Sequence, residues 1–75
     1  MVLLVVIDPA TYIDIVKNGE WGDYECERLY VGACDRQFMF FYTYAENGEP
    51  ILLIPHRVLE VCEEAVERAV KKLMD

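Results

Sequence analysis

The chain carries four segments that are apolar or aromatic at nearly every position, a pattern typical of strands buried on both faces. The first, Val2–Ile7, has six apolar residues in a row, and we therefore expect it inside the sheet, not at its edge. The others cover residues 29–33, 38–44 and 51–54. Asp35-Arg36 and Asn47-Gly48 predict the turns between them. The Asn-Gly pair favours a two-residue hairpin loop, because a type I′ turn needs positive φ at both central residues.

Two segments have the spacing of helices. Asp8 can cap a helix that begins at Pro9, and Gly19 can end it in the left-handed conformation, which predicts a helix over 9–18. A second, longer helix is predicted from Pro55 or His56 to Leu73. Its apolar positions recur every three or four residues, its acids lie early and its bases late, as the helix dipole favours.

These elements predict a single α+β domain over residues 1–75. The order is β-α-β-β-β-α, and we expect a two-layer sandwich with a mostly antiparallel sheet and both helices on one face.

One face of this predicted sheet has too much apolar surface. We assume that both hairpins have two-residue loops. The residues on the face opposite the helices should then be polar wherever water covers them. It stays apolar instead, at Tyr30, Met39, Phe41, Leu52 and Ile54. We expect these five residues to form the interface of a homodimer or higher oligomer, because ordinary monomers rarely expose such a patch. The alternative is that the helices lie on opposite faces and sandwich the sheet. A one-residue slip in register would exchange the faces.

Charge narrows the choice of partners. Fourteen acids against seven bases give a formal net charge of -7, which disfavours nucleic acid and anionic membranes and favours cationic partners. No apolar run is long enough to span a bilayer. Met1–Asp8 has neither the basic amino-terminal region nor the cleavage site of a signal peptide, so we expect a cytoplasmic protein. Few amides and many charged side chains resemble a heat-adapted composition.

The sequence excludes several kinds of chemistry. There is no serine for a serine nucleophile, and the scattered glycines form neither a P-loop nor a dinucleotide-binding motif. The chain has three cysteines, an odd number, and no Cys-x-x-Cys motif: Cys26, Cys34 and Cys62. We therefore expect three buried or half-buried thiols, with no disulfide framework, no metal and no cofactor.

Four residues are candidates for ligand binding. His56 and Arg57 begin the last helix, where a histidine can act as a base or bind an anion. Cys34 and Arg36 share a predicted turn, where an arginine can make a thiol reactive. Ordinary surface and turn roles remain the alternative for all four. The same holds for the acidic stretch Glu20–Glu27, whose spacing matches no calcium loop, and Trp21 within it is either docked on the core or a recognition anchor.

The helix, three strands and helix of residues 9–73 are similar in element order to double-stranded RNA-binding domains. That family binds phosphates with a lysine-rich start to its last helix, whereas here the matching residues 56–64 carry Glu60, Glu63 and Glu64. The expected function is therefore an acidic oligomeric module for protein interaction or regulation, without catalysis. A ligand-binding or catalytic oligomer with a site between subunits is the alternative, followed by nucleic-acid binding through the aromatic sheet strands.

Overall fold

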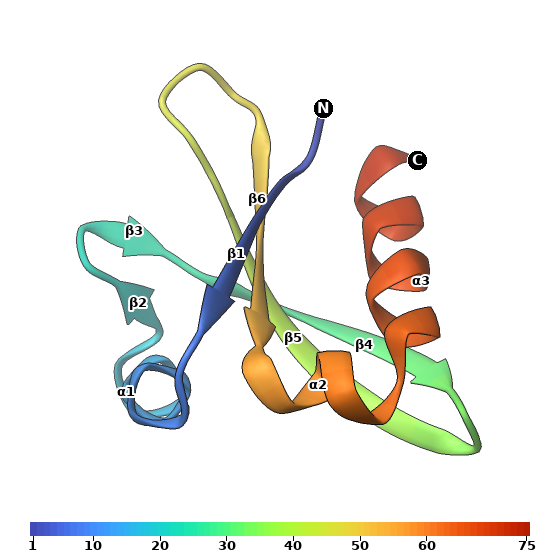
Figure 1. The fold of residues 1–75 in the computed structure, drawn as a ribbon. Coiled ribbons are helices and arrows are strands. Elements are labelled where there is room, and N and C mark those ends of the chain that lie inside the picture. The colour runs from blue at the N-terminus through green and yellow to red at the C-terminus, as the bar shows by residue number, and fades with distance from the viewer.

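The computed structural model describes residues 1–75 as a twisted sheet with helices packed on it (Figure 1). The elements, in chain order, are β1 (Leu3–Ile7), α1 (Pro9–Asn18), β2 (Glu20–Trp21), β3 (Tyr24–Glu25), β4 (Glu27–Ala33), β5 (Arg36–Tyr44), β6 (Pro50–Pro55), α2 (His56–Val61) and α3 (Glu63–Met74). The α+β class, the antiparallel meander and the approximate element order predicted from sequence are confirmed. A small β2–β3 hairpin is an addition.

Local signals set the bounds of α1. The Asp8 carboxylate accepts a hydrogen bond from the Thr11 backbone N–H at 2.8 Å, and Pro9 is the first helical residue. Gly19 ends the helix at φ 74°, and its N–H donates to the Ile15 carbonyl at 2.7 Å. The predicted helix over 9–18 is confirmed, because capping is decided within one turn of chain.

The main sheet has the strand order β1-β6-β5-β4. β4, β5 and β6 pair antiparallel, and β1 pairs parallel with β6, so that Leu4 lies beside Leu52 and Val6 beside Ile54. β1 is therefore an edge strand. The prediction that its apolar run places it inside the sheet is wrong for the single chain.

The two hairpins differ from their predicted geometry. Cys34 and Asp35, at φ 51° and 58°, form the two-residue turn between β4 and β5, one residue earlier than predicted. In the β5–β6 connection only Gly48 has positive φ, and the Ala45 N–H donates to the Glu49 carbonyl across a three-residue loop. This loop shifts β6 by one residue relative to the prediction, and the shift exchanges the faces of β6.

The helices lie on opposite faces of the sheet, as Figure 1 shows, and the predicted two-layer arrangement is wrong. Ala65 and Ala69 of α3 pack against Phe40 and the β6 residues on the same face. On the other face, Ile15 of α1 packs in a second cluster with Phe41. The register of β6 explains the difference, because it gives each face a hydrophobic set that needs its own helix.

The last helix is interrupted at Cys62. This residue is extended, at φ -162° and ψ 94°, and separates α2 from α3, so the predicted continuous helix is wrong. Its N–H donates to the Val58 carbonyl at 2.8 Å, and its side chain is buried. α3 keeps the predicted distribution of charge, with acids in its first turn and bases in its last.

Candidate functional site

A disulfide joins Cys34, in the turn between β4 and β5, to Cys62, at the start of α3. The two Cα atoms are 6.4 Å apart across 28 residues of sequence. The expectation of three free thiols is therefore wrong for two of them. No short sequence motif predicts this pair, because the two cysteines are brought together by the tertiary packing of the β4–β5 turn against the α2–α3 junction. Cys26 stays free and half-buried, and burial raises the pKa of its thiol.

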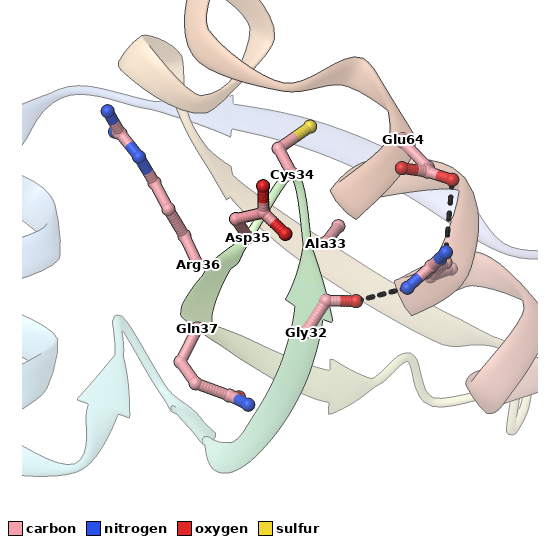
Figure 2. A pocket seen from close by; sticks show the side chains of 8 residues that line it. Gly32, Ala33, Cys34, Asp35, Arg36, Gln37 and Glu64 are labelled. Carbon is pink, nitrogen blue, oxygen red and sulfur yellow. Dashed lines mark hydrogen bonds and ion pairs between the residues drawn. The ribbon is translucent and has the colours of Figure 1, made fainter.

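An open, polar hollow of about 690 Å³ has Cys34, one half of the disulfide, in its lining (Figure 2). Cys34, Arg36, Glu64 and Arg68 are among its lining residues. Glu64 and Arg68 form an ion pair at 3.0 Å, and Arg68 also donates to the Gly32 carbonyl at 2.5 Å. The side chain of Arg36 extends away from this pair in Figure 2, so the hollow is not a convergent anion site.

His56 and Arg57 lie elsewhere. They line a separate cavity of about 240 Å³, together with Tyr12 and Ile13 of α1 and two prolines. Both are exposed, and both begin α2. The four residues predicted as a ligand site are thus divided between two cavities, Cys34 and Arg36 at one and His56 and Arg57 at the other. The sequence alone could not show this division. Cys34 and Arg36 lie at the turn between β4 and β5, whereas His56 and Arg57 follow the end of β6.

Cys34, Cys62 and Glu64 form the one cluster of side chains with metal-ligating atoms close together. Their sulfur and carboxylate atoms all lie within 4.8 Å of one another. Disulfide-bonded sulfurs are not thiolate ligands, so the cluster has metal-binding chemistry only when the bond is reduced. The acidic residues of the Glu20–Glu27 stretch form no such cluster. Trp21 in that stretch stacks on Tyr24 and packs against the α1-side core.

The predicted oligomer face is largely covered by the chain itself. Phe41, Leu52 and Ile54 are buried, and Met39 is half-buried, with its carbonyl accepting a hydrogen bond from the Tyr12 hydroxyl at 2.9 Å. The expectation that these residues form one exposed patch is wrong, because the register of β6 moves Leu52 and Ile54 to the α3 face while α1 covers Phe41. Only Tyr30, 55% exposed, keeps a large free surface.

The exposed apolar surface lies instead on β1. Leu4 and Val6 are 54% and 53% exposed on the face that α3 covers elsewhere, and Leu3 and Met1 are also exposed. α3 lies chiefly against β4 and β6, which leaves the β1 side of that face open. Nothing pairs with the outer edge of β1, since it ends the strand order and no turn or side-chain hydrogen bond reaches residues 2–7.

The opposite edge of the sheet is partly covered by the chain itself. β4 is the other edge strand, and α3 packs against its carboxyl-terminal part (Figure 1). Lys72 donates to the Tyr30 carbonyl at 2.7 Å, and Arg68 donates to the Gly32 carbonyl. Two outward carbonyls of β4 therefore have partners within the chain, and the two sheet edges differ sharply in their capacity to add a strand.

In comparisons with protein-family models, curated proteins and solved structures, nothing matches this chain. None of its helices combines the length and the apolar character that a membrane crossing requires.

Proposed function

We propose that this protein is a small interaction module that self-associates through β1. The observation that carries the proposal is the uncovered edge of this strand, with exposed Leu4 and Val6 beside it and no charged residue from Val2 to Ile7. Open, apolar edge strands readily pair with another strand, and soluble proteins usually protect them with charge, proline or a covering element. β1 has none of these protections, whereas α3 covers part of β4 and bonds two of its outward carbonyls.

A second copy of the chain is the partner that best fits this edge. Antiparallel pairing of two β1 strands across a twofold axis would satisfy the outward backbone groups of both copies. It would join two four-stranded sheets into one of eight strands. β1 would then have a neighbour on each side, which is the environment that its uninterrupted apolar sequence predicts.

Charge supports the same choice. The chain has a net charge of -7, so two copies repel each other over most of their surfaces. The β1 edge is an uncharged strip on which two copies can meet without placing carboxylates opposite each other. The strip has no basic residues that could bind nucleic acid and no acidic residues that could bind a cationic partner.

The test is a charge placed on the edge. Leu4→Lys puts an ammonium at an exposed position of β1, and Ile13→Lys makes the same change at an equally exposed position of α1, 54% in both cases. We expect Leu4→Lys to weaken self-association at least tenfold in sedimentation velocity, while Ile13→Lys leaves it unchanged. Tyr30→Lys probes the one residue with a large exposed surface on the interface predicted from sequence. Dissociation by Tyr30→Lys with no effect of Leu4→Lys would contradict the proposal.

A further inference from the structure

We propose that Cys34, Cys62 and Glu64 form a binding site for a thiophilic divalent cation, with Zn²⁺ as the fitting ion, when the disulfide is reduced. Disulfide and metal would then be alternative states of the same two sulfurs. This inference is independent of self-association through β1, because the site belongs to the β4–β5 turn and the α2–α3 junction.

The geometry of the three ligands suits zinc. In a tetrahedral site with Zn–S bonds of about 2.3 Å, two sulfurs lie roughly 3.8 Å apart. The ligand atoms here lie within 4.8 Å of one another, and Cα atoms 6.4 Å apart leave room for the sulfurs to separate by side-chain rotation once the bond is broken. Two thiolates and one carboxylate leave a fourth position for water or another ligand.

The amino-terminal end of α3 favours anionic sulfur at Cys62. Cys62 is the N-cap residue of α3, a twelve-residue helix whose amino-terminal end stabilises negative charge. Glu64 lies in the first turn of the same helix, and Arg68 is paired with it at 3.0 Å. Zn²⁺ with two thiolates and a carboxylate would carry one net negative charge, which the Arg68 guanidinium offsets.

The exchange between the two states balances with a dithiol as reductant. The dithiol transfers two electrons and two protons to the Cys34–Cys62 bond and becomes a disulfide itself, which leaves two thiols on the protein. Zn²⁺ then replaces the two thiol protons, which go to solvent. Cys34, exposed at the turn, is the accessible sulfur for the first attack, and Cys62 is the buried leaving group.

Titration of the full chain with Zn²⁺, and separately with Co²⁺ as a spectroscopic probe, tests the site. We expect the protein reduced with a phosphine and freed of metal to bind one ion per chain, with a cobalt–thiolate charge-transfer band, and the oxidised protein to bind none. Reduced Cys34→Ser and Cys62→Ser should lose the band's two-thiolate intensity and bind zinc at least a hundredfold more weakly. Cys26→Ser should bind like the native chain.

Two further variants separate ligation from folding. Glu64→Gln keeps both cysteines and should weaken zinc binding about tenfold while leaving the oxidised protein's melting temperature within a few degrees of native. Arg68→Gln breaks the same ion pair from the other side but keeps the carboxylate ligand, so it should weaken zinc binding less than Glu64→Gln does. Reduced protein that binds no zinc, binding that survives loss of either cysteine, or equal losses in Glu64→Gln and Arg68→Gln would each overturn the proposal.

Discussion

The ammonium of Lys72 donates a hydrogen bond to the backbone carbonyl of Tyr30 at 2.7 Å, and this contact fixes the carboxyl half of α3 along the outer edge of β4. Arg68 makes the corresponding contact one turn earlier, to Gly32. One helix thus covers a sheet face with its alanines and a sheet edge with its bases. The opposite edge has no such cover, and the asymmetry between the edges is the basis of the proposed function.

Loss of the contacts to the β4 edge should destabilise the fold modestly. We expect Arg68→Gln combined with Lys72→Gln to lower the free energy of unfolding by about 1–2 kcal/mol, because each charge-assisted hydrogen bond is partly solvated. Urea unfolding measures this value. Lys71→Gln removes one positive charge at the neighbouring position, where no hydrogen bond to β4 exists, and should stay within about 0.5 kcal/mol of native. Equal effects of the two replacements would show that net charge, not the edge contact, is responsible.

Reduction of the disulfide should cost more. The Cys34–Cys62 bond closes a loop of 28 residues. In the chain-entropy model this corresponds to about 3–4 kcal/mol of stability. Urea unfolding with and without a reductant, both with a chelator present, should show this difference for the native chain. The chain with Cys34→Ser and Cys62→Ser should unfold like the reduced native protein and should not respond to reductant. An insensitive native protein would mean that the bond does not form.

The packing of α1 on its own face can be tested with two neighbouring isoleucines. Ile15 is fully buried against the cluster that contains Phe41, whereas Ile13 is 54% exposed. We expect Ile15→Ala to lower the free energy of unfolding by about 2–4 kcal/mol and Ile13→Ala by less than about 0.5 kcal/mol. The reverse order would mean that α1 presents its other side to the sheet.

The cap of α1 should give a pH-dependent contribution to stability. Hydrogen bonds from the side chain and backbone of Thr11 lower the pKa of Asp8 below its ordinary value. The contribution is therefore present above the unfolded-state pKa and is lost as pH falls through the lower folded-state pKa. Asp8→Ala should lower the melting temperature at about pH 7, and the difference should shrink at about pH 2. Asp14→Ala, on the same helix without a capping contact, should give little change at either pH. A pH-independent deficit in Asp8→Ala would contradict the linkage.

The sequence predicted those parts of the fold that depend on local signals. Asp8, Pro9 and Gly19 act within one turn of chain, and α1 begins and ends where they predict. The order of β4, β5 and β6 follows equally from short apolar segments separated by turns. The class of the domain could therefore be predicted before any tertiary contact was known.

Register and long-range pairing could not be predicted in this way. The loop at Asn47-Gly48 has three residues instead of two, and this single residue decides whether Leu52 faces α1 or α3. The break at Cys62 and its bond to Cys34 depend on where the β4–β5 turn lies relative to the helix. The candidate metal cluster was missed for the same reason, since its ligands come from distant segments.

The position of β1 in the sheet also differs from the prediction, for another reason. Its six apolar residues predict burial on both faces and a place inside the sheet, whereas in the single chain its outer edge is unpaired and Leu4 and Val6 are exposed. In the proposed dimer the second neighbour is a second β1. The apparent conflict between sequence and subunit would thus be resolved by self-association.

The molar mass in solution tests this central claim most directly. Size-exclusion chromatography with multi-angle light scattering, from about 1 to 100 µM oxidised protein, should show two copies of the 8.7 kDa chain, about 17 kDa in total, and Leu4→Lys should return the mass to that of one chain. A native protein that stays at 8.7 kDa over the whole range, or a Leu4→Lys variant that remains at twice that mass, would contradict self-association through β1.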